Sequence, residues 1–331
     1  MVSPPAETLK RSATARGGPG PPGDHPTSPT QLVGHAGLAI QREGGSPTRR
    51  HLDDAVSASL DRLELDVCST ADGALVMRHD ASLSDDSLIA DLTLRELRRM
   101  DCELLTVDEA VEHLDGRIPI LFDIKTTRAA QLLGAWFRGR RDIEGYATCT
   151  ENLQWLIHLR FAAPRVARWP SYPDIGERRT HHVQRVVVGL WRSHTNLDAL
   201  RRSAADIHRT AKLLRRAPRE SLNRLGGLPW RDRLPHDIRQ TSADVGAAGI
   251  CVHHWVVSDE LVDEAHRLAL HVNAWTVNNP FAARVMAGAG VDSITTDRVD
   301  LVRLALRSLP SPVLPADGNR RLREAVRSAP R

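Results

Sequence analysis

The chain has 331 residues with 41% hydrophobic content and a net charge of +4, enough for a sizeable core in one large or two smaller domains. Its basic residues are almost all arginine, and no dense basic run with interleaved aromatics supports nucleic-acid binding, so we attribute the arginine to coding bias. The four cysteines form no CxxC pair, which argues against a zinc site or a disulfide framework and favours free thiols in a reducing compartment.

The two ends of the chain differ from its middle. Residues 1–30 are rich in Gly and Pro and bury too little apolar surface to offset their ordering entropy, which predicts a disordered tail. From residue 310 the chain is rich in Pro and Arg and predicts a loose tail, leaving one domain over residues 31–309. The sequence shows no apolar leader and no run of 18 apolar residues, so we expect a cytoplasmic protein with no integral membrane segment.

In the first half of the chain, strands and helices alternate. Apolar residues at every second position predict strands, and apolar residues at helical spacing behind Thr or Asn caps predict helices. The predicted strands cover 31–37, Leu63–Val67, 117–125, 145–150 and 165–169, with a hairpin strand over 74–77. The predicted helices cover 51–60, 92–97, 106–114, 127–137 and 152–161, with a polar loop over 38–50.

The second half begins with the stretch that is hardest to interpret, residues 180–245. We predict a strand over 186–190, an arginine-rich amphipathic helix over 198–216 and a loop over 218–240. The helix is either a solvated outer face or part of a lid. Beyond it the pattern is clear again. Strands are predicted at 249–252, 271–277 and 292–297, with helices at 258–270, 280–288 and 299–309.

About eight strand–helix repeats predict parallel strands joined by crossover helices. With this length, a closed TIM (β/α)8 barrel is the best interpretation. A doubly wound open sheet is the alternative, although no GxGxxG or P-loop pattern favours it.

Polar side chains occur near the carboxyl ends of the predicted strands, where barrels of this kind carry their active sites. These positions are His35, Glu64, Asp66, Asp123, Lys125, Trp275 with Asn278 just beyond it, and Asp297. The turn Ala71–Gly73 folds a hairpin that brings His79 to the same end. Carboxylates there suit a hard divalent cation, Mg²⁺ or Ca²⁺, and two imidazoles can divide the acid and base roles. Taken singly, each motif also fits an ordinary ion pair, loop histidine or core tryptophan.

The same residues resemble a known family in order and spacing. The matching segments are Gly34-His35-Ala36-Gly37, Leu63-Glu64-Leu65-Asp66-Val67, Thr70-Ala71-Asp72-Gly73 leading to His79-Asp80, Phe122-Asp123-Ile124-Lys125, Trp275-Thr276-Val277-Asn278, and Gly290 to Asp297. Together they resemble the core of the glycerophosphodiester phosphodiesterase family over residues 32–305, with a gap from about 150 to 248.

The resemblance implies a barrel of the phospholipase C-like phosphodiesterase type. It implies that Glu64, Asp66 and Asp123 hold the divalent cation and that His35 and His79 are the acid/base pair. Lys125 would neutralise phosphate oxygens, and Trp275 would contact the substrate, a small-molecule phosphodiester.

Three positions depart from the family pattern. Ala36 stands where members usually have Arg, and Gly45–Arg50 replaces a Pro-Glu-Asn-Thr motif. Alanine cannot clamp a phosphate as a guanidinium does, so we considered Arg42, Arg49 or Arg50 as substitutes. Asp123 also stands where many members use Glu.

Three functions remain open at this point. The first is a metal-dependent phosphodiesterase that hydrolyses glycerophosphodiesters, or related lipid-derived diesters, to an alcohol and glycerol phosphate. The second is a phospholipase D-like lyase that leaves a cyclic phosphate. The third is a non-catalytic binder of phosphate ligands, motivated by the missing arginine. The sequence does not indicate an oligomeric state.

Overall fold

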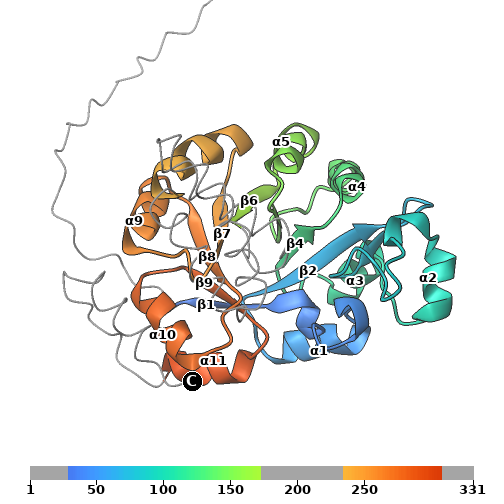
Figure 1. Ribbon diagram of the computed structural model, residues 1–331, viewed down its shortest axis with the longest axis horizontal. Helices are drawn as coiled ribbons and strands as arrows, with labels where there is room; N and C mark the ends of the chain where they lie inside the picture. Colours follow the sequence, from blue (N-terminus) through green and yellow to red (C-terminus); the bar gives the residue numbers. More distant parts are fainter. Residues whose placement is uncertain (1–28, 173–233, 308–331) are drawn as a thin grey trace, which may run out of the picture.

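The computed structural model describes residues 29–172 and 234–307. Within these residues a ring of parallel strands surrounds the central axis, and helices surround the ring (Figure 1). The ring strands are β1 (Gln31–Gly34), β2 (Arg62–Ser69), β4 (Ile120–Ile124), β5 (Tyr146–Thr150), β6 (Ala167–Tyr172), β7 (Gly249–His253), β8 (His271–Trp275) and β9 (Ser293–Thr296).

The ring is closed by the first strand of the chain. β1 pairs in parallel with β9 on one side and with β2 on the other, and the remaining strands pair in sequence order around the circle. One further strand, β3 (Leu75–Met77), pairs antiparallel with β2 outside the ring and forms the predicted hairpin. This closure confirms the TIM barrel prediction and rules out the open doubly wound sheet.

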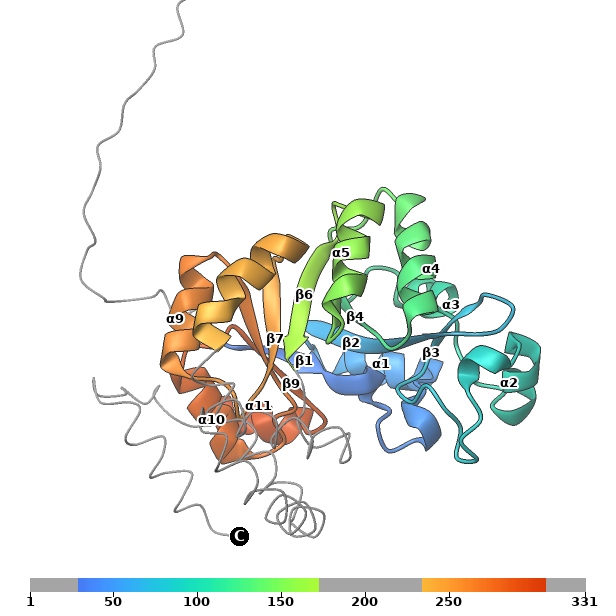
Figure 2. The same cartoon turned by 45° about the horizontal axis from the view of Figure 1, so that its top comes forward.

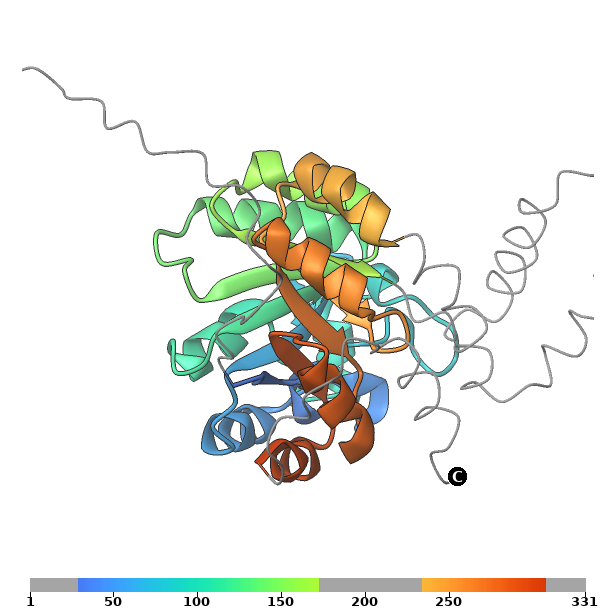
Figure 3. The same ribbon diagram turned by 90° about the vertical axis from the view of Figure 1, so that its left-hand side faces the viewer.

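The outer layer consists of helices that follow individual strands (Figure 3). They are α1 (Arg49–Ser57), α2 (Leu94–Met100), α3 (Val107–Leu114), α4 (Thr127–Arg138), α5 (Leu153–Ala162), α9 (Asp259–Arg267), α10 (Pro280–Gly288) and α11 (Val299–Arg307), with residues 234–245 also helical. β3 and α2 lie together to one side of the barrel (Figure 2).

Capping residues set several of the helix starts. Thr93 and Thr106 each accept a hydrogen bond from the backbone of the glutamate three residues on, Glu96 and Glu109, whose carboxylates accept from the cap in return. Both capping boxes were predicted from the sequence. Asn279 caps α10 with its side-chain oxygen, which accepts from the backbone N–H groups of Phe281 and Ala282, and Pro280 stands at the first position, where a missing N–H costs nothing.

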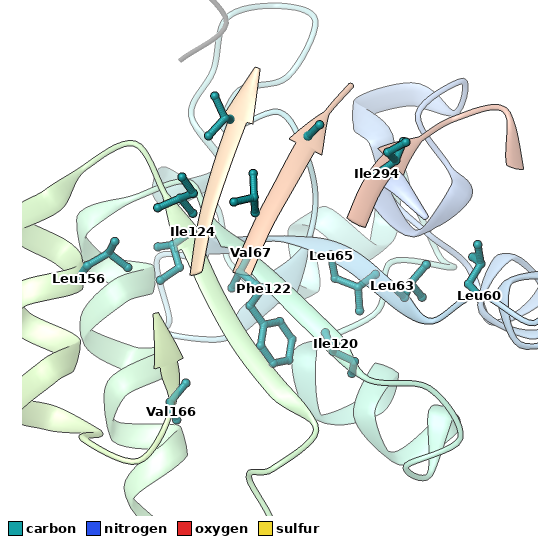
Figure 4. Close-up of a cluster of buried hydrophobic side chains, with 14 of the residues drawn as sticks. Leu60, Leu63, Leu65, Val67, Ile120, Phe122, Ile124, Leu156, Val166 and Ile294 are labelled. Atoms are coloured by element: carbon teal, nitrogen blue, oxygen red, sulfur yellow. The ribbon is translucent and has the colours of Figure 1, made fainter. Parts of the chain in front are cut away.

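The apolar core lies between the ring and the helices. Leu63, Leu65 and Val67 of β2 are completely buried there, next to Phe122 of β4 (Figure 4). Because side chains alternate along a strand, Glu64 and Asp66 point to the barrel interior instead. The apolar alternation therefore fixes which residues face the axis.

Several predicted boundaries differ from the structure. The strand predicted over 31–37 ends at Gly34, because Ala36 and Gly37 have positive φ angles that cannot continue a strand. Part of the predicted loop over 218–240 is wrong, since residues 234–245 form a helix that covers the barrel near β6 and β7. The predictions at 186–190 and 198–216, and most of the two tails, lie outside the described residues.

No helix among the described residues is long and apolar enough to span a membrane. The division of the chain into a domain over 31–309 and two tails stays a prediction.

Replacing Phe122 should test the core. Its ring is fully buried and lies within 6.0 Å of the rings of Trp136, Phe137 and Tyr146, so Phe122→Ala should lower the free energy of unfolding by about 3–5 kcal/mol. The matched control is Phe161→Ala, whose ring is 78% exposed and which should change stability by less than about 0.5 kcal/mol. Urea unfolding measures both, and equal effects would contradict this assignment of the core.

Candidate active site

Three carboxylates meet at the carboxyl ends of β2 and β4. Glu64 and Asp66 are 5% and 2% exposed, and the register pairs Asp66 directly with Asp123 on the neighbouring strand. One oxygen from each of the three side chains lies within 4.8 Å of the other two. The structure thus brings together the three residues that the sequence predicted as a cation site.

Lys125 is the positive group in this cluster. Its Nζ lies 2.8 Å from Asp66 Oδ1 and donates a hydrogen bond of 2.7 Å to Asp123 Oδ2. One amine cannot balance three carboxylates. Glu64 Oε1 and Asp66 Oδ2 are buried and have no hydrogen-bond partner among the described residues. Unpaired buried anionic oxygens of this kind suit a hard divalent cation, so the donor set fits Mg²⁺ or Ca²⁺.

The pKa values reflect this excess of negative charge. Burial and the neighbouring charge of Asp66 raise the pKa of Glu64 well above its usual value. Burial alone would lower the pKa of Lys125, but Asp123 and Asp66 outweigh it and raise that pKa. The two partners of Lys125 differ. Burial raises the pKa of Asp123 despite the lysine, whereas at Asp66 the charges of Lys125 and His79 outweigh burial and lower the pKa.

His35 lies beside the cluster, just after β1. Its Nδ1 is 2.6 Å from Asp297 Oδ1, and its ring centroid is 6.0 Å from that of His79, with the two rings nearly perpendicular. Burial would lower the pKa of His35, but the hydrogen bond to Asp297 and the charge of Glu64 raise it to about 9. At neutral pH this imidazole is therefore positively charged.

His79 is held by the loop that follows the first strand. The backbone N–H groups of His79 and Asp80 both donate to the carbonyl of Gly44, at 3.0 and 3.3 Å, and His79 Nδ1 is 3.0 Å from Asp80 Oδ1. Gly44 and Gly45 have positive φ angles, and a Cβ at Gly45 would lie 2.6 Å from the Cβ of His79. Gly45 thus lets the loop approach the histidine closely, and Gly44 leaves room for the guanidinium of Arg78, which a Cβ there would meet.

Trp275 ends β8 on the opposite side of the mouth. Its ring lies edge-on to His253, with centroids 5.4 Å apart. Its indole Nε1 is buried and has no hydrogen-bond partner among the described residues. A buried indole N–H usually has an acceptor, so this donor is available to a ligand.

The missing arginine is not replaced by Arg42. Both of its guanidinium nitrogens bind Asp101, at 2.7 and 2.5 Å, in a bidentate pair. Arg49 and Arg50 are exposed at the start of α1. At the position of the missing side chain, Ala36 adopts a left-handed conformation, with φ of 47°, and its backbone N–H donates to Glu64 Oε2 at 2.6 Å.

Two polar residues of the site were named in the sequence but given no role there. Asn278 and Asp297 stand at the ends of β8 and β9, and Asn278 Nδ2 donates to Asp297 Oδ2 at 2.6 Å. A search for polar residues near the carboxyl ends of the strands identifies both of them. It does not reveal that Asp297 binds His35, because that contact requires β1 and β9 to be neighbours.

Comparison with known families agrees with this geometry. The model of the glycerophosphoryl diester phosphodiesterase family matches residues 46–301. The chain belongs to this family. It is thus an enzyme of the phosphoric diester hydrolase class. The match includes the three carboxylates, Lys125, His79 and Asp297, whereas His35 lies upstream of it.

Solved structures share the fold. A glycerophosphodiester phosphodiesterase from Parabacteroides distasonis is 19% identical, with a TM-score of 0.58, and the match covers 84% of this chain and 97% of that one. One from Thermotoga maritima is 17% identical, with a TM-score of 0.56 and coverage of 83% and 98%. A phosphodiesterase from Oleispira antarctica, in complex with its product sn-glycerol-3-phosphate, is 17% identical, with a TM-score of 0.57 and coverage of 85% and 98%. No curated protein sequence matches.

The charge of His35 is open to direct measurement. In metal-free protein its imidazole should titrate near pH 9. Because this pKa is raised above the ordinary histidine value of 6.5, the stability that the ion pair contributes should be complete below about pH 6.5 and lost as the pH rises through 9. NMR titration of the histidine ring protons, assigned with His35→Gln, measures the pKa. A value near 6.5 in metal-free protein would contradict the ion pair.

Divalent cations should stabilise the fold by relieving repulsion among the carboxylates. At a concentration 100 times the dissociation constant, Mg²⁺ or Ca²⁺ should add about 2.7 kcal/mol to the free energy of unfolding. Asp123→Asn should reduce this gain, whereas the surface control Asp108→Asn, 73% exposed in its side chain, should retain it. Thermal unfolding with each metal measures the effect. A gain that Asp123→Asn leaves unchanged would place the cation elsewhere.

Proposed function

We propose that this enzyme hydrolyses glycerophosphodiesters, or related lipid-derived diesters, to an alcohol and glycerol phosphate by acid/base catalysis with His35 and His79. The observation that carries the proposal is the pair of perpendicular imidazoles, 6.0 Å apart, beside a buried carboxylate cluster. Two imidazoles at that separation can act on opposite sides of a phosphodiester that lies over the carboxylates.

Glu64, Asp66 and Asp123 are the residues that we propose to hold Mg²⁺ or Ca²⁺. When bound, the cation supplies positive charge that stabilises the negative charge developing on the phosphoryl oxygens. Lys125, which contacts Asp66 and Asp123 at 2.8 and 2.7 Å, would donate to a phosphate oxygen when those carboxylates held the cation.

The surroundings of the two histidines suggest which is the acid. His35 bears a proton at neutral pH, because Asp297 and the nearby carboxylates raise its pKa to about 9. We therefore assign it the donation of a proton to the departing alcohol oxygen. His79 then accepts the proton of the attacking hydroxyl, from either water or the substrate itself.

Trp275 is the proposed contact for the organic part of the diester. Its unpartnered Nε1 offers a hydrogen-bond donor, and its ring offers an apolar surface beside His253. The Oleispira phosphodiesterase binds sn-glycerol-3-phosphate as its product, which supports glycerol phosphate as the product here.

Ala36, in place of the arginine that family members usually have, motivates one other candidate function, a non-catalytic binder of phosphate ligands. Arg42 is bound to Asp101, so phosphate affinity at Ala36 depends on Lys125 and the cation. A weak clamp would raise KM for every diester, whereas a ligand binder that has lost catalysis would bind diesters without turning them over. Turnover of any glycerophosphodiester with Mg²⁺ or Ca²⁺ would exclude the binder.

Replacing either histidine should abolish turnover without unfolding the protein. His35→Ala and His79→Ala should each lower kcat by about 10²–10⁴-fold, the usual contribution of general acid–base catalysis. His113→Ala is the control, because His113 is paired with Asp53 on the outer helices, away from the carboxylates. Release of glycerol phosphate from a panel of diesters, with each metal in turn and after EDTA, gives the rates. Full activity of either variant would reject the two-histidine mechanism.

The lyase is separated from the hydrolase by its product. Hydrolysis in ¹⁸O-labelled water should place the label in the final phosphomonoester, and mass spectrometry detects the shift. An accumulating unlabelled cyclic phosphate would instead establish the lyase.

A further inference from the structure

Asp297 binds one nitrogen of His35 and leaves the other unpaired. We propose that Asp297, itself locked by Asn278, positions His35 for proton transfer by holding a proton on its Nδ1 and turning its Nε2 toward the substrate. This inference rests on the proposed function, and it adds two positioning residues to the site.

The first step is the contact between Asp297 and the ring. The distance from His35 Nδ1 to Asp297 Oδ1 is 2.6 Å, and both side chains are only 18% exposed. No partner of Nε2 is present among the described residues. A carboxylate can only accept, so Nδ1 must be the nitrogen that donates to it. The bond therefore selects the tautomer in which the free nitrogen is Nε2 whenever the imidazole is neutral.

The second step is the immobilisation of Asp297. Its other oxygen, Oδ2, accepts from Asn278 Nδ2 at 2.6 Å. The amide oxygen of Asn278 in turn accepts from the backbone N–H of Asp297 at 2.9 Å and from the hydroxyl of Thr296 at 3.0 Å. Both carboxylate oxygens and both ends of the amide are thus in use. Asp297 cannot rotate away from His35 without breaking bonds to Asn278.

The third step is the register of the barrel. Gly34 of β1 pairs with Thr296 of β9, so His35 and Asp297, the next residues of each strand, emerge side by side. Asn278 follows β8, the next strand of the ring. Three adjacent strand ends therefore supply the histidine, the carboxylate and the amide. The arrangement is built into the backbone and does not depend on long flexible side chains.

The other histidine of the site lacks this support. His79 Nδ1 is 3.0 Å from Asp80, a sequence neighbour whose side chain is 57% exposed. The side chain of His79 is therefore restrained less than that of His35. A proton donor must point at a single leaving oxygen, and its misplacement by about 1 Å can cost 10²-fold in rate.

Several charged groups besides Asp297 act on His35. Glu64 and Asp66 on β2 raise its pKa. Burial would raise the pKa of Asp297, but His35 lowers it, and Arg298 next to it adds a smaller lowering. The imidazole of His79 also lies 6.0 Å away. A change in the pH profile caused by substituting Asp297 must therefore be compared with the profile of a control variant that keeps all of these charged groups.

Asp297→Asn is the central test. An asparagine can accept with only one of its two terminal atoms, so it cannot satisfy both His35 and Asn278. We expect kcat to fall by about 10²-fold with KM nearly unchanged. Loss of the negative charge should also move the alkaline limb of the kcat profile to lower pH by roughly one unit or more. Asn278→Ala should give a smaller loss, about tenfold, because Asp297 remains but is less restrained.

Asp292→Asn is the matched control. Asp292 precedes β9 as Asp297 follows it, and its carboxylate also binds a histidine, with His266 Nε2 at 3.0 Å. It lies at the opposite end of the barrel from the site. Asp292→Asn should lower thermal stability and leave the pH profile of kcat unchanged. If Asp297→Asn behaves in the same way, or keeps wild-type kcat, the positioning role is overturned.

A spectroscopic measurement separates this inference from the proposed function. In ¹⁵N-histidine-labelled wild-type protein above about pH 9, where the His35 imidazole is neutral, long-range ¹⁵N–¹H correlations should show its proton on Nδ1, and Asp297→Asn should lose that preference. Circular dichroism verifies that the variant is folded. If wild-type protein turns over no diester but shows the Nδ1 proton, the proposed function fails and the positioning contact stands. If diester turnover is robust and Nδ1 carries no proton, only the positioning role fails.

Discussion

Burial of negative charge beside a single lysine is the constraint on which this structure depends. Glu64 and Asp66 occupy the inner face of a strand whose outer face carries Leu63, Leu65 and Val67, and Asp123 joins them from the neighbouring strand. Burying unpaired carboxylates is costly, and Lys125 offsets only part of that cost. The scaffold must hold the cluster against its own repulsion. The closed ring does so, since its backbone hydrogen bonds fix each strand end.

That constraint also explains why the outward and inward faces of the strands carry different kinds of residue. Outward residues such as Leu63 and Phe122 supply the packing that holds the helices to the ring. Inward residues near the carboxyl ends of the strands are then free to be polar. Stability and chemistry are thus carried by alternate residues of the same strands. A substitution on one face affects the other mainly through the strand backbone.

Much of the site followed from alternation and strand order in the sequence. The shared face of Glu64 and Asp66 and the hairpin that delivers His79 were predictable because each depends on local pattern, and the closed barrel was predictable from the number of strand–helix repeats. The helix over 234–245 was missed because its pattern is weak beside the unclear stretch before it. The pairing of Arg42 with Asp101 was also missed. It joins two loops whose proximity no periodicity encodes.

The closure of the ring by its first and last strands has a consequence for biosynthesis. His35 and its partner Asp297 are separated by 262 residues, so their contact forms only after almost the entire barrel has been synthesised. A nascent or truncated chain can already contain the carboxylates, Lys125 and His79, yet its first histidine has no carboxylate to orient it. The pairing of His35 with Asp297 therefore marks the completion of the barrel, and a partly folded chain lacks it.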